Sequence, residues 1–261
     1  MEMLIFAFIV GLMFGSFANV VIVRLPGKKS VIKPPSACPA CGIRLAPWDL
    51  IPVVSWVFLM GKCRRCRAKI SLRYPLVELV CGMVFVGMMH LSPTLSVAPL
   101  WALGFVLVTV AFIDWDTREI PDELLICAAF AGALWVALGH FAPGWFPLAP
   151  AWYHGLLGMA AGALPLLIID RLALLIWKKD GFGYGDVKLM AVIGLFLGWE
   201  MTLLSLVLSV LICFPFAVYL LVKQQVKQDG DFNGYMAFGP FLCLGALLAL
   251  WFGECFFAIL L

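Results

Sequence analysis

Long apolar runs separated by short polar segments dominate this chain. Most runs hold about twenty residues with almost no charge, which is the length that a helix needs to cross the hydrocarbon core of a bilayer. The pattern predicts an all-α polytopic membrane protein with about eight transmembrane helices. The predicted helices are residues 4–23, 76–92, 98–114, 123–141, 153–176, 187–199, 203–222 and 238–260.

The shortest predicted helix, 187–199, has an alternative interpretation as one half of a tight hairpin with 203–222. The first run, 4–23, is too long for the core of a signal peptide, and its apolar pattern continues past Gly15 and Ser16. We therefore expect it to be retained as a transmembrane helix. The composition agrees, because 64% of the residues are hydrophobic and only 13% are charged, a balance that excludes a soluble domain.

Basic residues fall in alternate connections between the predicted helices. Connections with Lys or Arg are 24–75, 115–122, 177–186 and 223–237. Connections without them are 93–97, 142–152 and 200–202. Because Lys and Arg accumulate on the cytoplasmic side of membrane proteins, the first group is predicted to be cytoplasmic. Eight helices with both termini outside the cytoplasm satisfy this distribution.

The first cytoplasmic loop contains two Cys-x-x-Cys pairs. The four cysteines are Cys38, Cys41, Cys63 and Cys66. Four thiolates can surround a zinc ion as a tetrahedron, and four protein ligands close the site, so the predicted metal is structural. Disulfides are not expected on the reducing side of the membrane, and a redox Cys-x-x-Cys normally occurs singly. The basic residues of this loop can also bind anionic lipid headgroups.

Two aspartates adjoin apolar runs on the predicted cytoplasmic side. Asp114 ends one run, and Asp186 begins another after Gly183 and Gly185. Two carboxyl groups in contact share a proton, so one can deprotonate water while the other donates to a carbonyl. The glycines allow an extended peptide to approach the backbone. This reasoning predicts an aspartic-protease pair.

Other interpretations remain open on the residues alone. A charged helix end is usually solvated, and acids beside a membrane can also form a proton or ion pathway. Asp116 competes with Asp114 for the role of first acid. A transporter would need acids at mid-membrane depth, however, and a non-catalytic assembly scaffold docking through the cysteine loop gives no reason for the GFGYGD sequence.

Six motifs in order resemble the type IV prepilin peptidases, also called prepilin leader peptidase/N-methyltransferases. The motifs are GSFANVVIVRLP at 15–26, CPAC at 38–41, IPVVSW at 51–56, GKCRRCRAKISLRYPLVEL at 61–79, FIDWDTREIPD at 112–122 and GFGYGDVKL at 181–189. The resemblance covers nearly the whole chain. Residues 183–186 match the Gly-x-Gly-Asp signature of the membrane aspartyl proteases in this family, and Asp114 corresponds to the family's other catalytic aspartate.

The resemblance implies an endopeptidase of the bacterial inner membrane. Such enzymes remove the basic leader of type IV prepilins and type II secretion pseudopilins at the cytoplasmic membrane face. Many members then methylate the new N-terminus with S-adenosylmethionine, and the four-cysteine loop marks these bifunctional members. No glycine-rich S-adenosylmethionine loop is evident, so this activity rests on the resemblance alone. Candidate methyltransferase residues are Arg73, Glu78 and Gly82.

The expected organisation has three parts. Residues 1–23 form the first transmembrane helix, 24–75 the zinc-binding loop, and 76–261 a seven-helix protease core. The expected partners are prepilins or pseudopilins and membrane lipids, with no nucleic acid.

Overall fold

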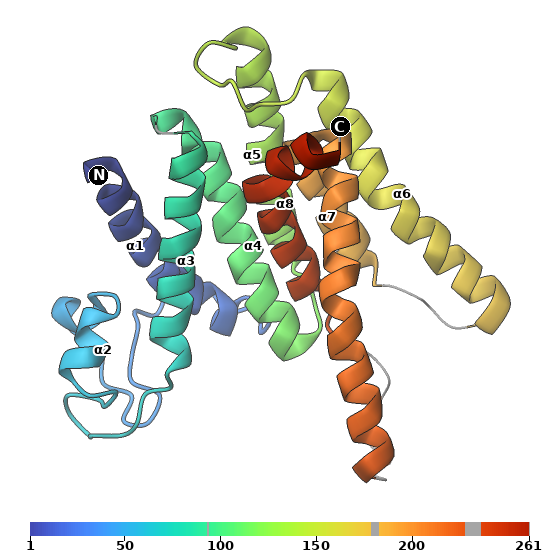
Figure 1. Cartoon of the computed structure of the whole chain (residues 1–261). Helices are drawn as coiled ribbons and strands as arrows, with labels where there is room; N and C mark the ends of the chain where they lie inside the picture. Colours follow the sequence, from blue (N-terminus) through green and yellow to red (C-terminus); the bar gives the residue numbers. More distant parts are fainter. Residues whose placement is uncertain (93, 179–182, 228–235, 261) are drawn as a thin grey trace. The chain divides into compact units, whose positions relative to one another are not determined.

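The computed structural model describes residues 1–92, 94–178, 183–227 and 236–260, and these residues are helical apart from loops and two isolated β-bridges (Figure 1). The elements in order are α1 (Glu2–Arg24), η1 (Pro47–Leu50), α2 (Val54–Phe58), α3 (Arg73–Leu91), η2 (Leu95–Val97), α4 (Ala98–Thr117), α5 (Asp122–Phe141), α6 (Trp152–Trp177), α7 (Tyr184–Lys227) and α8 (Gly239–Leu260). The prediction of an all-α membrane protein is confirmed.

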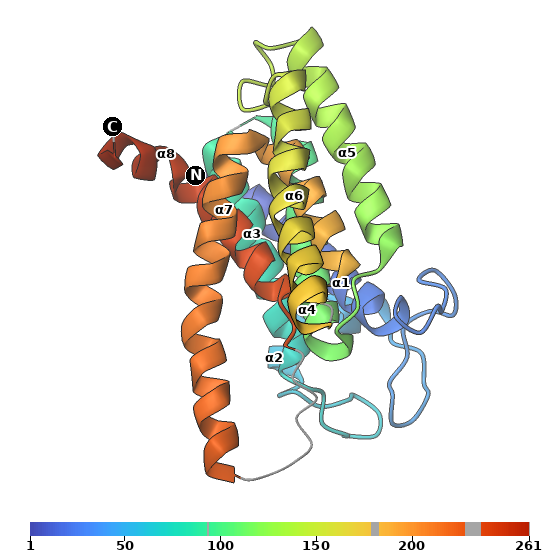
Figure 2. The same cartoon turned by 90° about the vertical axis from the view of Figure 1, so that its right-hand side faces the viewer.

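Six helices in the described part of the chain are long and apolar enough to cross a membrane, namely α1, α3, α4, α5, α6 and α7. The eight expected helices differ from these at the C-terminal end. Residues 187–199 and 203–222 both belong to α7, and α8 has a shorter apolar stretch, Gly239–Gly253. Within α7, Gly198 has φ 77° and ψ 173°, which is not helical. Since only glycine adopts such angles readily, α7 consists of two arms, 184–197 and 199–227 (Figure 2).

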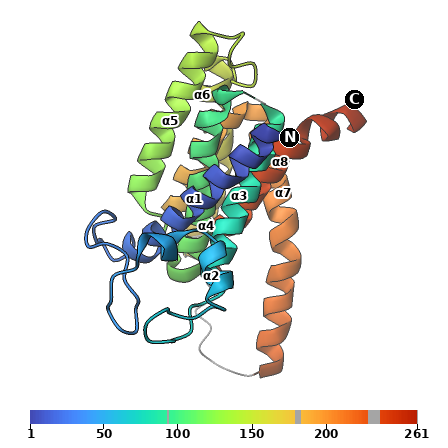
Figure 3. The same ribbon diagram turned by 90° about the vertical axis from the view of Figure 1, so that its left-hand side faces the viewer.

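The chain forms two compact units, Met1–Thr109 and Val110–Leu261. In the first unit, α1 packs directly on α3, because glycines let the two backbones meet. A Cβ atom added to Gly11 would lie 2.7 Å from the Cα atom of Gly82, and one added to Gly15 would lie 2.6 Å from the Cα atom of Glu78. Figure 3 shows the two helices side by side, with the loop that joins them at their common end.

In the second unit, each arm of α7 has its own packing partner. The first arm packs on α6, where a Cβ atom added to Gly158 would lie 2.1 Å from the carbonyl oxygen of Gly194. The second arm packs on α8, where a Cβ atom added to Gly245 would lie 2.6 Å from the carbonyl oxygen of Ser205. These close backbone contacts hold the first arm of α7, which carries Asp186, on α6 and the second arm on α8.

Candidate functional site

Asp114 lies in the last turn of α4, and not at the end of the helix as the sequence suggested. The helix continues to Thr117 and ends at Arg118, which has a left-handed φ of 58°. The backbone N–H of Arg118 donates to the carbonyl of Asp114 over 2.9 Å. The Asp114 side chain is buried and only 5% exposed. Asp116, two positions further along the same helix, is exposed.

Gly239 is a contact of Asp114 that sequence reasoning missed. Its backbone N–H, at the start of α8, donates to Oδ2 of Asp114 over 2.9 Å, and the bond is buried. A Cβ atom at position 239 would lie 2.8 Å from the same oxygen, so a larger residue there would have to displace the carboxylate. The available signal was the Gly-Pro pair at the head of the last apolar run, which is typical of a helix start.

Asp186 lies in the first turn of α7, directly after Gly183 and Gly185 in the sequence. The backbone N–H of Asp186 donates to the carbonyl of Gly183 over 3.0 Å, which closes a tight turn at the helix start. A Cβ atom at Gly185 would lie 3.0 Å from the Cβ atom of Ile120, so the small residue lets α7 approach the connection between α4 and α5. Gly181 of the same motif lies outside the described residues.

The structure brings the two predicted acids together in one cavity of about 440 Å³, and their carboxylates interact electrostatically. Gly183 and Gly185 line the same cavity. The other lining residues are Arg118, Glu119, Ile120, Asp122, Glu123 and Lys188. Lys188, on the first arm of α7, donates to both carboxylate oxygens of Asp122, at the start of α5, over 2.8 and 3.0 Å.

Two helix N-termini converge on the acidic pair, because Asp186 lies in the first turn of α7 and the first N–H of α8 bonds Asp114. The N-terminus of a helix carries a partial positive charge, which stabilises an anion nearby. The cavity therefore suits a pair of carboxyl groups with one negative charge between them. Such a pair can activate a water molecule and polarise a carbonyl group at once.

The four cysteines of the predicted metal site also converge. Their Sγ atoms all lie within 4.8 Å of one another, and those of Cys38 and Cys66 are 3.8 Å apart. Tetrahedral zinc with Zn–S bonds of about 2.3 Å requires Sγ atoms separated by roughly 3.8 Å. The donor set and its spacing therefore fit one tetrahedral metal ion.

Both Cys-x-x-Cys segments have the same backbone geometry. The N–H of Gly42 donates to the carbonyl of Cys38 over 2.9 Å, and the N–H of Arg67 donates to that of Cys63 over 3.0 Å. The residue after each second cysteine has a left-handed φ, 69° at Gly42 and 61° at Arg67. This repeated turn points both sulfurs of a pair to one side, which is how two local motifs build a common site.

The electrostatics of the cluster favour a bound cation. Backbone N–H groups of Cys41 and Ala40 lower the pKa of the Cys38 thiol to about 6. At Cys66 the backbone of Ala68 also favours the thiolate, but burial and the neighbouring sulfurs outweigh it and raise the pKa to about 11. Four adjacent thiolates therefore need a positive ion to hold all four charges.

The three methyltransferase candidates lie along α3. Arg73 is its first residue, Glu78 is buried, and Gly82 packs where a Cβ atom would meet the ring of Phe8 at 2.8 Å. Oε2 of Glu78 accepts a hydrogen bond of 2.7 Å from the backbone N–H of Val53, a contact that the sequence did not indicate.

Two protein-family models match the segments of the chain that contain the cysteine cluster and the acidic cavity. Residues 9–91 match the model of the bacterial peptidase A24 N-terminal domain, and residues 101–218 match that of the type IV leader peptidase family. Among curated proteins, the chain is similar to prepilin leader peptidase/N-methyltransferases from three organisms. That of Aeromonas salmonicida is 34% identical, with 95% of this chain and 90% of the relative covered. That of Burkholderia pseudomallei is 33% identical, with 98% and 88% covered, and that of Pseudomonas putida is 31% identical, with 95% and 90% covered.

No solved structure shows a significant match to the chain. The two family models together span both Cys-x-x-Cys segments and both acids of the cavity. The relatives cover nearly the full length of the chain at more than 30% identity. The chain therefore belongs to the type IV leader peptidase family.

Proposed function

We propose that this protein is a membrane aspartic endopeptidase that removes the leader peptide of type IV prepilins and type II secretion pseudopilins. The observation that carries the proposal is the cavity that holds Asp114 and Asp186 together at the ends of two membrane helices. The names of the relatives supply the substrate class. The family places the protein in the bacterial inner membrane as a multi-pass protein.

The two aspartates act as one unit with a shared proton. The ionised carboxyl takes a proton from a water molecule, whose oxygen attacks the carbonyl carbon of the scissile peptide bond. The protonated carboxyl donates its proton to the carbonyl oxygen. The tetrahedral intermediate then collapses, the C–N bond breaks, and the departing amine takes the proton held by the first carboxyl. One hydroxyl of the intermediate returns its proton to the second carboxyl, which releases the new carboxyl terminus and restores the shared proton. The hydrogen bond from Gly239 orients Asp114 for this exchange.

Substrate orientation follows from the position of the cavity. We assign the cavity and the cysteine loop to the cytoplasmic face, and both chain termini to the opposite face, because basic residues fall in alternate connections along the chain. The substrate's apolar helix then lies in the membrane and its basic leader in the cytoplasm. Gly183 and Gly185 leave room for an extended peptide backbone beside Asp186.

The second proposed activity is methylation of the new N-terminus, which the names of the relatives support. S-adenosylmethionine, when bound, supplies the methyl group. Arg73, Glu78 and Gly82 remain the candidate residues for this activity, because they share one stretch of α3 next to the cysteine loop. We further propose that the loop, residues 24–75, is the metal-binding element and that the helices from residue 76 onward form the protease core.

We assign zinc to the four-cysteine site. The ligands are all thiolates, their spacing fits a tetrahedron, and four protein ligands leave no open position for a substrate. Zinc therefore stabilises the fold of the loop and takes no part in peptide hydrolysis.

The test is cleavage of a purified prepilin by the detergent-purified protein, followed by mass measurement. D114N and D186N should each lower the rate by at least about a thousandfold, because each removes one member of a catalytic pair. D116N is the matched control, since Asp116 lies on the same helix but is exposed. Normal cleavage by either D114N or D186N would refute the proposal. A methyl increment on the cleaved product tests the second activity separately.

A further inference from the structure

The short helix α2 is held at the level of the membrane helices and does not lie beyond them. Its N-cap residue, Val53, donates its backbone N–H to Glu78 over 2.7 Å. Glu78 is five residues into α3, so it lies about 7.5 Å above the start of that helix. The backbone of Glu78 in turn contacts Gly15 of α1, nine residues before that helix ends at Arg24. Val53 is therefore held beside the first two turns of α3, a helix long and apolar enough to cross a membrane.

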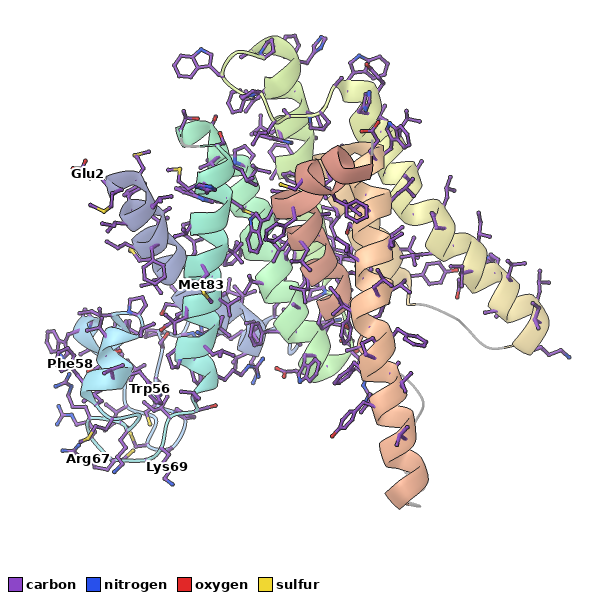
Figure 4. The ribbon with its side chains drawn as sticks, viewed as in Figure 1. Glu2, Trp56, Phe58, Arg67, Lys69 and Met83 are labelled. Atoms are coloured by element: carbon purple, nitrogen blue, oxygen red, sulfur yellow. The ribbon has the colours of Figure 1, made fainter. Side chains whose placement is uncertain are left out.

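Helix α2 presents large apolar side chains to its surroundings at this depth. Phe58 is 83% exposed and Val57 59%, and Met60, two residues beyond the end of the helix, is 73% exposed. Trp56, which precedes them, turns the other way, because its Nε1 donates to the carbonyl of Ile70 over 3.2 Å and its ring packs against Gly61. Figure 4 shows Phe58 on the side of α2 away from α3. The helix thus has one face packed on the loop and one apolar face without a partner in the described part of the chain.

The segment that follows α2 is strongly basic. Its exposed cations are Lys62, Arg64, Arg65, Arg67 and Lys69. Figure 4 shows Arg67 and Lys69 at the tip of the loop. The loop from residue 24 to 75 contains a single acidic residue, Asp49, and it forms an ion pair with Arg64 at 2.7 Å. The apolar face of α2 is therefore next in sequence to a cluster of positive charge.

We propose that α2 and the basic segment 62–69 form an interfacial anchor that binds anionic phospholipid. Apolar and aromatic side chains at the membrane boundary enter the headgroup region, and adjacent Lys and Arg pair with anionic headgroups. The basic leader of a substrate does not suit this surface, because like charges repel. A second copy of this chain brings the same positive charge and is disfavoured for the same reason. The anchor holds the metal-binding loop against the membrane surface.

The test places the photoreactive residue p-benzoylphenylalanine at position 58 in the full-length protein. The protein is reconstituted in nanodiscs of phosphatidylglycerol mixed with phosphatidylcholine, irradiated and analysed by mass spectrometry. We expect phospholipid adducts in which phosphatidylglycerol is enriched over its share of the bilayer. Covalent dimers, or an absence of adducts, would overturn the proposal, and so would adducts with no enrichment. Retained prepilin cleavage shows that the labelled protein is folded.

A paired charge substitution tests the basic part of the anchor. R65Q/K69Q should markedly lower the phosphatidylglycerol enrichment of the adducts, because each basic residue near an anionic surface strengthens association about fivefold. K28Q/K29Q removes the same charge from the first turn of the loop, outside the segment, and should leave the enrichment in place. Equal effects of the two variants would mean that the loop attracts lipid only through its total charge, and the assigned anchor would be wrong. Cleavage activity is measured independently, so failure here leaves the peptidase proposal standing.

Discussion

The backbone N–H of Gly239 and the carboxylate of Asp114 are joined by a buried hydrogen bond of 2.9 Å, although 125 positions separate them in the chain. This bond attaches the start of α8 to the last turn of α4. A carboxylate that accepts a backbone N–H loses rotational freedom and gains a donor that favours its charge.

Substitution of Gly239 by alanine should impair catalysis more than substrate binding. The added Cβ atom would lie 2.8 Å from Oδ2 of Asp114 and displace the carboxylate. Loss of a hydrogen bond to a charged group costs about 1.5–3 kcal/mol, so kcat should fall by roughly 10- to 150-fold while KM changes little. Rates of leader removal, measured by mass spectrometry over a range of prepilin concentrations, separate the two constants.

The matched control is G253A, on the same helix, where the added atom meets the flexible end of the Met201 side chain. Similar losses in both variants, accompanied by equal drops in melting temperature, would indicate general damage to α8 and contradict the specific role of Gly239.

Gly185 should be needed for its small size, because a Cβ atom there would lie 3.0 Å from the Cβ atom of Ile120. G185A should push α7 away from the connection between α4 and α5 and misplace Asp186 by a few tenths of an ångström. We expect a loss of cleavage of about tenfold or more, since catalytic geometry tolerates little displacement. The double variant I120A/G185A creates space and should recover much of the rate. A double variant no better than G185A would show that the contact with Ile120 is not the cause.

Removal of two cysteines should abolish metal binding. C38S/C63S breaks both Cys-x-x-Cys pairs, and elemental analysis should find about one zinc ion per chain in the unmodified protein and essentially none in the variant. The loop should then become more susceptible to trypsin, because a structural zinc site contributes directly to folding. C127S, in a lipid-exposed position of α5, is the control and should keep its zinc. Unchanged zinc content in C38S/C63S would exclude the assigned site.

Glu78 should hold the loop through its hydrogen bond with Val53. Glutamine can still accept from the N–H, whereas alanine cannot, so E78A should speed amide exchange at Val53 by about tenfold and E78Q much less. Amide hydrogen exchange with peptide-level mass analysis provides the measurement. If E78Q keeps the protection but loses methylation, the carboxylate has a chemical role beyond this contact. If E78A leaves exchange unchanged, the bond does not hold the loop in solution.

The ion pair between Lys188 and Asp122 should contribute little to stability, although it lies beside the acidic pair. Both side chains are more than half exposed, and exposed ion pairs are worth about 0.2–1 kcal/mol. K188M should therefore change the melting temperature by no more than a few degrees. A large loss of stability would show that this pair holds α5 and α7 together.

Much of the architecture was accessible from the order of residues alone. The membrane helices follow from local sums of transfer free energy, and the predicted orientation follows from where Lys and Arg fall. The two Cys-x-x-Cys pairs indicate a metal site because each pair is a local turn with its own geometry. The acids at 114 and 186 were singled out because each adjoins an apolar run, and the structure places both in one cavity.

Only the tertiary structure determined the features that depend on contacts between segments far apart in the sequence. The helix continues for three residues after Asp114, with the Asp114 side chain buried and Asp116 exposed, and only the packing of α4 shows which of the two acids faces the cavity. The contacts of Gly239 with Asp114 and of Val53 with Glu78 use backbone N–H groups, which every residue except proline carries and which therefore leave no mark in the sequence. Hydrophobic periodicity reports which segments enter the membrane, but only the packed backbone determines which helix start meets which carboxylate.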